Sequence, residues 1–536
     1  MGVALIVVGV LQVPYLIGYA NAALGTEYTG LLINVEDGSY LSAIGEGIKG
    51  AWLYHIPFTS EPHTPAFVEV FYLALGHVAA LLHLSATAMW HWARALTALI
   101  LFIALFGFIQ AFVKNSFQRW TCFLFALLGA GFDWSWFPWE HGDTLSAVPL
   151  DWRMPEAHLF FGALTYPHYA VNIALMLAVL GMLGYAFVGV MPERRRWGLA
   201  IGAGFANLFL TLVYPFLIFL TAGIIAASYL YLVWRVRKIL WRQAAWVLIA
   251  FAIPLPLCAY YAMVLTTNPV FQLWNAQAVT LSPDPLHYVL AYAPYLALGV
   301  LTLNSIRRQP DSPLVFLWIW IGVAAVLLYA PLNAQRRFVM GLQVPFAILA
   351  TMGLTEVLLP RLERTPAFER LSHWRNFTVP GIRKLTVVTL IAILSLANVY
   401  VWLSSAILLG WVQPYPIFLP TAELEAMDWL RANTQSSDTV LAAYWTGSFI
   451  PARAGNSVFV GQRYETIGFD EKRRLTEKFF DAATDDAWRS QFVRDQHIAF
   501  VFWGRGERDL GGFDPEHASY LENVFANESV QVYRVH

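Results

Sequence analysis

The stretches "MGVALIVVGVLQVPYLIGYA" (residues 1–20) and "NVEDGSYLSAIGEG" (residues 34–47) place a charged loop directly after a long hydrophobic run. A membrane-spanning helix needs about 20 mostly apolar residues. Because the first stretch lacks a basic start and a small-residue cleavage site, we predict a first span rather than a cleaved signal. In the second stretch, Glu36 and Asp37 stand side by side. An acidic pair there can accept a proton, bind a cation or hold a sugar hydroxyl, although Asp-Gly also suits a plain turn.

The composition indicates a polytopic membrane protein. Of the 536 residues, 58% are hydrophobic and only 13% are charged, which is far from the average soluble domain. The formal net charge of −1 provides no basic surface, so we predict no nucleic-acid partner. The two cysteines, Cys122 and Cys258, lie in apolar runs, and a disulfide framework is not expected.

Long apolar runs recur along residues 1–411 and predict a mainly α-helical bundle of about eleven spans. The runs lie at 3–22, 95–113, 120–137, 170–190, 198–213, 215–234, 244–265, 288–305, 313–330, 341–359 and 385–410. A further run at 65–85 carries Glu69, His77 and His83. We predict that it lies at the membrane surface, and a true span is the alternative.

The distribution of Lys and Arg predicts the orientation of the bundle. Half of the 34 basic residues fall in five short clusters: Lys114/Arg119, 194–196, 235–242, 307–308 and 361–384. If residues 65–85 do not cross the bilayer, all five clusters share one face, which the positive-inside rule makes cytoplasmic. If that run does cross, the clusters lie opposite the N-terminus. We therefore predict a multi-pass protein of the inner (plasma) membrane with loops 24–92, 138–169, 266–287 and 331–340 outside.

Residues 412–536 differ in character and predict a soluble, extracytoplasmic α/β domain. Their apolar runs are only of strand length, and charges are dense. Short strands alternating with helices are typical of an α/β domain. The expected elements are helices at 421–433 and 470–485, strands at 439–444, 457–461 and 498–504, and a hairpin at 524–535.

Ionisable residues crowd the loops predicted to lie outside. Intramembrane or membrane-edge charges are costly and tend to mark function or to pair with one another. A carboxylate there can act as general base toward an acceptor hydroxyl. The adjacent Arg336 and Arg337 in "NAQRRF" can hold a phosphate and stabilise it as a leaving group. Together these groups suit glycosyl transfer from a lipid-phosphate sugar.

With these residues in place, the sequence resembles the polytopic glycosyltransferases of the C-type fold, which include protein O-mannosyltransferases, aminoarabinose transferases and bacterial relatives. The resemblance covers most of the chain through short motifs. They are "NVEDGSYL", "GAWLYHIPFTSEPHTPAFVEVFYLALG", "WARALTALILFIALF", "QRRFVMGLQVPFAILATMGL" and the terminal "VQVYRV". It implies a lipid-phosphate-sugar-dependent enzyme of the cell envelope.

The resemblance also implies roles for particular residues. Asp37 matches the catalytic base, with Glu36 as second choice, and Arg336 and Arg337 match a clamp on the lipid phosphate. A lysine-proline pair of the aminoarabinose transferases is replaced by "EPHTP", so His63 is expected to assist at the phosphate, with Tyr40 nearby. A second acidic site matches Glu140 and Asp143 in "FPWEHGD", which has no DxD spacing. A divalent metal such as Mg or Mn would have as weak candidate ligands Asp37, Asp143 and His168.

Two other functions fit the composition. A transporter or flippase of a lipid-linked or sugar substrate would show internal repeats and charges at the membrane midplane. The two halves of the chain show no clear repeat, and the charges collect at one edge, which favours the enzyme. A non-catalytic scaffold for envelope assembly is the third reading. The sequence names neither the sugar nor the acceptor, which is a protein, lipid or polysaccharide.

Overall fold

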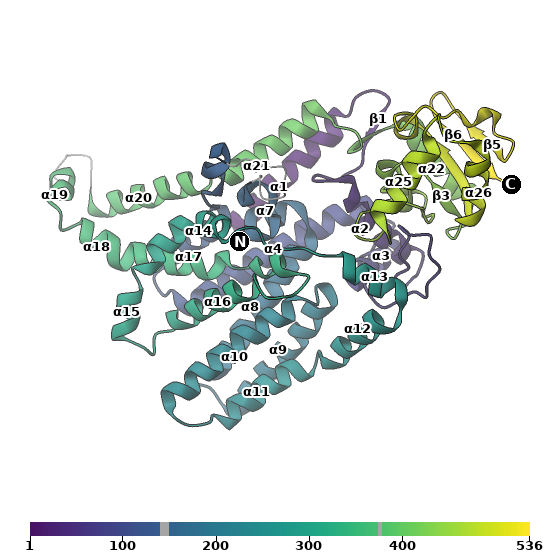
Figure 1. The fold of residues 1–536 in the computed structure, drawn as a ribbon. Helices are drawn as coiled ribbons and strands as arrows, with labels where there is room; N and C mark the ends of the chain where they lie inside the picture. The colour runs from purple at the N-terminus through teal and green to yellow at the C-terminus, as the bar shows by residue number, and fades with distance from the viewer. Residues whose placement is uncertain (140–148, 373–377) are drawn as a thin grey trace. The chain divides into compact units, whose positions relative to one another are not determined.

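The computed structural model describes residues 1–139, 149–372 and 378–536. Internal contacts divide the chain into two compact units. Figure 1 labels the helices and strands of both units. The first unit holds Met1–Gln12, Arg94–Ala259 and Thr280–Ser404. The second unit holds Val13–Ala93, Tyr260–Val279 and Ser405–His536. The loop after the first helix therefore belongs to the same compact unit as the C-terminal residues.

Every predicted apolar run contains a helix, but the helices differ in length. Among the described residues, six are long and apolar enough to cross a membrane. They are α1 (Gly2–Asn21), α4 (Ala86–Phe112), α8 (Pro167–Val188), α9 (Glu193–Val213), α10 (Leu217–Val236) and the segment Gln335–Leu362 that contains α17 (Gln343–Met352). These helices identify a multi-pass membrane protein.

The remaining runs form bent or shorter helices. Two pairs pass the same test only together: α11 (Trp241–Ala252) with α12 (Leu255–Thr267), bent by 45°, and α20 (Val379–Leu394) with α21 (Leu396–Ile407) and its extension to Val412, bent by 47°. Three runs hold helices shorter than the usual span: α5 (Ser116–Leu128), α14 (Pro285–Val300) and α16 (Leu314–Leu327). The structure thus contains six to eight spans by length and composition, where the sequence predicted about eleven.

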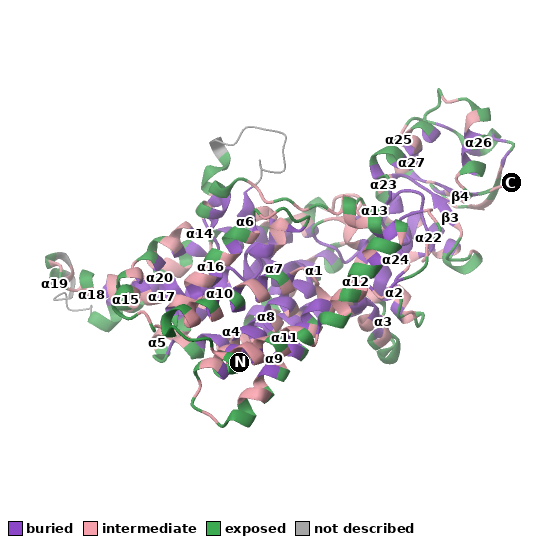
Figure 2. Ribbon diagram, turned by 60° about the horizontal axis from the view of Figure 1, so that its bottom comes forward, coloured by how far each residue is buried: buried purple, intermediate pink, exposed green. Residues whose placement is uncertain are grey.

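One span occupies the centre of the first unit. The apolar window within Gln335–Leu362 is 94% buried, whereas the windows of the other five long helices are 33–50% buried (Figure 2). Neighbouring helices α5, α14 and α16 pack around α17. The helix that follows Arg336 and Arg337 is therefore enclosed by protein rather than by lipid.

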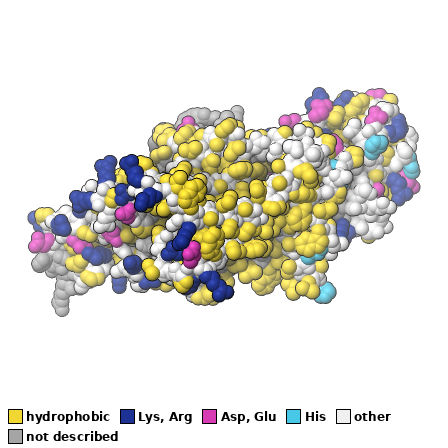
Figure 3. Space-filling view, turned by 90° about the horizontal axis from the view of Figure 1, so that it is seen from below, with side chains coloured by type: hydrophobic (Ala, Val, Ile, Leu, Met, Phe, Trp, Pro, Cys, Tyr) yellow, Lys and Arg dark blue, Asp and Glu magenta, His cyan; other side chains and the backbone are white. Residues whose placement is uncertain are grey.

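The basic segments of the first unit are tied together by ion pairs. Arg242 pairs with Glu193 at 3.4 Å, and Arg235 pairs with Asp311 at 3.1 Å. These contacts bring the start of α9, the end of α10 and the segment before α16 to one end of the unit. On the face that Figure 3 shows, hydrophobic side chains form a broad area, and Lys and Arg side chains gather beside it.

The C-terminal residues form the predicted α/β arrangement. A four-stranded sheet has the order β3 (Thr439–Leu441), β4 (Ile498–Trp503), β6 (Gln531–Val535) and β5 (Leu521–Ala526). β3 is parallel to β4, and the other pairs are antiparallel. Helices α22 (Thr421–Asn433), α25 (Phe469–Phe480) and α26 (Asp486–Asp495) complete it. Phe479, Phe492 and Val501 are in its buried core.

Two predicted elements of this domain differ in the structure. The segment 457–461 makes one isolated bridge, from Val458 to Val440, instead of a strand. On its other edge, the amide of Val458 donates to the carbonyl of Pro57 in the loop after the first helix. Helix α25 ends at Phe480 rather than near 485, because Asp481 adopts an extended conformation and bridges Gly512.

The loop after the first helix packs closely within the second unit. Its strand β1 (Thr26–Tyr28) pairs antiparallel with β2 (Phe418–Pro420). Helices α2 (Gly38–Ile48) and α3 (Val70–Leu82) cross at two glycines, where a Cβ on Gly47 would lie 2.2 Å from the carbonyl oxygen of Leu73. At 13 residues, α3 is shorter than a span. Its predicted position at the membrane surface stays a prediction.

Candidate active site

The pair Arg336 and Arg337 lies in the first unit, just before the central span. Arg336 Nε and Arg337 Nη1 are each 3.0 Å from the same oxygen, Oε1 of Glu156. The Glu156 side chain is 1% exposed, and those of Arg336 and Arg337 are 24% and 18% exposed. Two guanidinium groups thus share one buried carboxylate.

Aromatic side chains surround Arg337. Its Nη1 donates to the hydroxyl of Tyr169 at 2.5 Å, and its guanidinium carbon lies 6.0 Å from the ring centres of Tyr169 and Tyr214. His168 is buried and stacks on Tyr214, with ring centres 5.6 Å apart. A cation between aromatic faces in a water-poor site is held in a defined position and attracts anions strongly. No local sequence pattern indicates that Glu156, Tyr169 and Tyr214 contact Arg337, because they are far from it along the chain.

Two carboxylate–imidazole pairs fix the surrounding loop. His158 Nε2 is 2.8 Å from Oδ1 of the fully buried Asp151, and His287 Nδ1 is 3.0 Å from both oxygens of Asp133. The carboxylate of Asp133 also accepts from the amide of Leu150 at 2.6 Å. These contacts hold the short helices that precede and follow Glu156 in the chain, α6 (Leu150–Arg153) and α7 (Leu159–Thr165), and thereby help to position the Glu156 carboxylate.

Glu36 and Asp37 lie in the second unit, at the start of α2. The Glu36 carboxylate accepts from Asn34 Nδ2 at 2.9 Å and from the backbone amide of Arg463 at 2.8 Å. Glu36 therefore attaches the loop to the C-terminal residues. Asp37 is half-buried, ends a short 3₁₀ turn and precedes α2. Gly38 is required at the next position because a Cβ would lie 2.8 Å from the carbonyl oxygen of Ser448.

The structure places Tyr40 and His63 in packed surroundings. The Tyr40 ring contacts those of Tyr72 and Trp90, at centre-to-centre distances of 4.7 and 5.6 Å. His63 stacks on His55 at 4.1 Å, and both of its ring nitrogens are engaged, with the carbonyl of Glu61 and the amide of Ile56. Burial lowers the pKa of His63, so the ring is neutral near pH 7. His63 also lines a cavity of about 570 Å³ beside Asn268.

The predicted second acidic site and the predicted metal ligands are not found together in the part of the chain that the structure describes. Glu140 and Asp143 fall outside the described residues. Within residues 1–139, 149–372 and 378–536, no three His, Cys, Asp or Glu side chains gather as a metal ion requires. His168 faces Tyr169, Tyr214 and Arg337 rather than carboxylates. No catalytic step is assigned to a metal.

Comparison by sequence identifies no relative: no protein-family model and no curated protein sequence matches the chain. Comparison of folds does. ArnT from Cupriavidus metallidurans, bound to undecaprenyl phosphate, superimposes with a TM-score of 0.57 and 13% identity, over 99% of this chain and 98% of that one. The archaeal oligosaccharyltransferase AglB from Archaeoglobus fulgidus, bound to an inhibitory peptide and a dolichol-phosphate, gives a TM-score of 0.53 and 13% identity, over 92% and 69%.

A third structure extends the likeness to a larger protein. The arabinofuranosyltransferase AftD from Mycobacteria superimposes with a TM-score of 0.50 and 14% identity, over 99% of this chain but 40% of that one. At such identities the likeness concerns the fold. The chain therefore has the fold of the polytopic membrane glycosyltransferases of the C type, as its sequence motifs predicted.

Proposed function

We propose that this protein is a glycosyltransferase that moves a sugar from a polyprenyl-phosphate donor to an acceptor on the extracytoplasmic side of the inner membrane. The observation that carries the proposal is the sharing of Glu156 by Arg336 and Arg337. Two adjacent guanidinium groups beside a single carboxylate can bind the oxygens of an anion such as phosphate. The shared fold supports a lipid phosphate as that anion, because ArnT and AglB bind undecaprenyl phosphate and dolichol-phosphate.

In this proposal the arginines stabilise the leaving group. As the bond between the anomeric carbon and the phosphate oxygen breaks, negative charge grows on the lipid phosphate. Arg336 and Arg337 offer planar donors that match phosphate oxygens. Because Tyr169 and Glu156 already hold Arg337, little reorganisation is needed when that charge appears.

Asp37 is the proposed general base. The acceptor oxygen bonds to the anomeric carbon as its proton passes to Asp37, and polyprenyl phosphate leaves as an anion. A single displacement of this kind inverts the configuration at the sugar. Glu36 is a poorer base, because its carboxylate is held by Asn34 and by the amide of Arg463.

The first experiment measures undecaprenyl phosphate binding to the purified full-length protein by native mass spectrometry. We expect R336Q/R337Q to weaken binding at least tenfold, since about 1.5–3 kcal/mol accompanies each hydrogen bond to a charged group. R473Q/R474Q is the matched control: it removes an adjacent arginine pair whose side chains are 53% and 73% exposed on α25. Equal binding by the two double variants would rule out the phosphate role of Arg336 and Arg337.

A further inference from the structure

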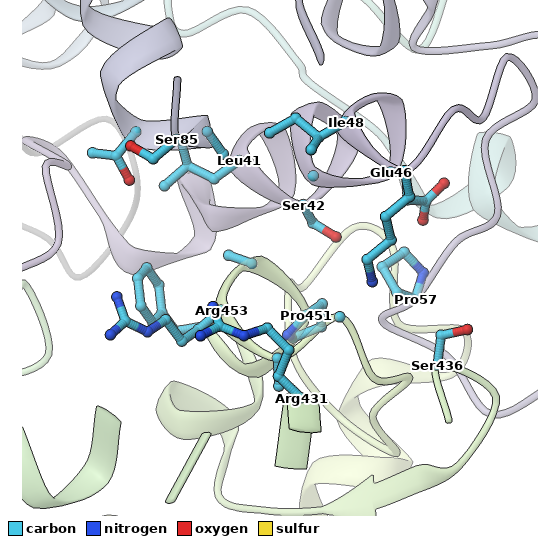
Figure 4. A pocket seen from close by; sticks show the side chains of 18 of the residues that line it. Leu41, Ser42, Glu46, Ile48, Pro57, Ser85, Arg431, Ser436, Pro451 and Arg453 are labelled. Atoms are coloured by element: carbon cyan, nitrogen blue, oxygen red, sulfur yellow. The ribbon is translucent and has the colours of Figure 1, made fainter. Parts of the chain in front are cut away.

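The second unit encloses a cavity of about 1050 Å³ that the proposed transfer chemistry does not use. Figure 4 shows it between α2, with Ser42 and Glu46, and the C-terminal residues that carry Arg431, Pro451 and Arg453. Glu36 and Asp37 do not line it. All of its lining residues belong to the second unit. The cavity is therefore separate from the acidic pair Glu36 and Asp37.

The cavity lies where two membrane spans end. Tyr19, in the last turn of α1, and His91, near the start of α4, both line it and are joined by a hydrogen bond of 2.9 Å. Large apolar side chains close by in the chain are exposed, with Leu16 at 62%, Leu81 at 78% and Trp92 at 65%. Such side chains at the ends of spans face the lipid–water boundary. A molecule in this cavity can thus keep an apolar part in the bilayer.

Positive charge exceeds negative charge around the cavity. Arg453 pairs with Asp428 at 2.8 Å and with Glu27 at 3.3 Å, and Arg431 pairs with Asp428 at 3.0 Å. Lys49 also lines the cavity, and within the described part of the chain its ammonium group has no ion-pair partner. Three cations, those of Lys49, Arg431 and Arg453, and two carboxylates, those of Glu27 and Glu46, therefore line the cavity.

The remaining carboxylate at the cavity, that of Glu46, balances Lys49 only in part. Burial raises the pKa of Glu46 to about 7, so the group is about half protonated at neutral pH. Lys49 is exposed, so its ammonium group is charged and accessible to a ligand. An accessible ammonium in the lining of a cavity can pair with an anionic group.

The Lys49 ammonium group lies close to the backbone of Gly455. Gly455 has a φ of +86°, and a Cβ there would lie 2.4 Å from Lys49 Nζ. A glycine at 455 thus permits both the backbone conformation and the approach of the ammonium group. Ser42 and Ser436 line the same space, and their hydroxyls make no hydrogen bond to the described residues. A cation and free hydroxyls together are the donors that a phosphate ester requires.

We propose that this cavity binds the phosphate-bearing headgroup of a membrane lipid, with Lys49 as its principal cationic ligand. The site is distinct from the arginine pair and does not depend on the proposed glycosyl transfer. The lipid source is favoured over a soluble phosphate ester because the cavity adjoins the ends of α1 and α4 and their exposed apolar side chains.

The test uses native mass spectrometry of the full-length protein with phosphatidylglycerol and with phosphatidylcholine of the same acyl chains. We expect tighter binding of phosphatidylglycerol, a loss of about tenfold in K49Q, and retention in K49R, since one charge-assisted contact is removed or kept. K114Q is the matched control, because Lys114 is an exposed lysine that follows the other end of α4. K114Q should bind as the unmodified protein does.

Three results would overturn the proposal. Equal affinity for the two lipids would rule out the headgroup site, and so would unchanged lipid binding in a K49Q protein whose melting temperature is unchanged. Displacement of the lipid by sn-glycerol 3-phosphate at comparable concentration would make the ligand a soluble phosphate ester. Failure of the arginine experiment alone leaves this site intact, because K49Q does not alter Arg336 or Arg337.

Discussion

Arg337 Nη1 lies 3.0 Å from Glu156 Oε1, although 181 residues separate the two along the chain. Arg336 lies at the same distance from the same oxygen. The carboxylate is buried and provides one negative charge for two guanidinium groups. This shared carboxylate holds the two guanidinium groups close together, and it leads to the first prediction.

Replacing Glu156 by glutamine should destabilise the protein and strengthen its response to lipid phosphate. E156Q removes the buried carboxylate that two mostly buried cations contact, which costs about 3 kcal/mol. Undecaprenyl phosphate should then raise the melting temperature of E156Q more than that of the unmodified protein, because the phosphate supplies the missing charge. The measurement is thermal unfolding with and without the lipid.

The control for this comparison is E193Q. Glu193 pairs with Arg242 through side chains that are 50% and 74% exposed, so its loss should change stability by less than about 1 kcal/mol. An E156Q protein that melts like E193Q, or that gains no more from the lipid than the unmodified chain, would contradict the assignment of the cluster.

Asp37 and Glu36 should respond differently to amide substitution. D37N should lower the rate of lipid-phosphate release by about 10²–10⁴, the usual contribution of a general base, while donor binding stays the same. E36Q should retain activity and lose about 1 kcal/mol of stability, because it weakens the contact to the Arg463 amide. Product release and thermal melting distinguish the two. A D37N protein of full activity would favour the transporter or scaffold functions.

The stability of the second unit should fall as pH rises. Tyr54 donates to Glu465 Oε2 at 2.7 Å, which favours the ionised carboxylate. Burial, together with the carboxylates of Glu69 and Glu46, outweighs this contact and raises the pKa of Glu465 to about 8 from an ordinary 4.5. Between these values the folded chain holds a proton that the unfolded chain has lost. Stability is therefore greatest below about pH 4.5 for this group and declines up to about pH 8.

Melting curves from pH 5 to 9 test this effect. The glutamine of E465Q cannot titrate, so its melting temperature should decline less steeply over that range than that of the unmodified protein. E516Q, at an exposed position, should follow the unmodified curve. Parallel curves for E465Q and the unmodified chain would show that Glu465 is not the group responsible.

Two glycines of α2 should behave oppositely when changed to alanine. A Cβ at Gly47 would lie 2.2 Å from the carbonyl oxygen of Leu73, so G47A should force α2 and α3 apart and cost about 1–3 kcal/mol. A Cβ at Gly45 meets nothing within 4 Å, and G45A should be neutral or stabilising by up to about 1 kcal/mol. Thermal melting compares them. A G47A protein as stable as G45A would mean that the crossing is loosely packed.

Local patterns in the sequence predicted much of the fold. The helix expected at 421–433 is α22, and the hairpin expected at 524–535 is formed by β5 and β6. Every apolar run contains a helix, because apolar length and helix propensity act over neighbouring residues. Among the described residues, six helices are long and apolar enough to cross a membrane, or eight if each bent pair is one span, and α5, α14 and α16 are shorter than 20 residues.

The sequence by itself determined that this is a membrane protein with an acidic pair after the first helix, a late arginine pair and a C-terminal α/β region, because composition and spacing are local properties. Only the tertiary structure decided that Glu156 and Tyr169 hold Arg337, that Glu36 attaches to the Arg463 amide, and that Lys49 lies against Gly455. These partners come from distant parts of the chain. Their choice depends on which buried charges and hydrogen-bonding groups meet after packing, and no local pattern records that.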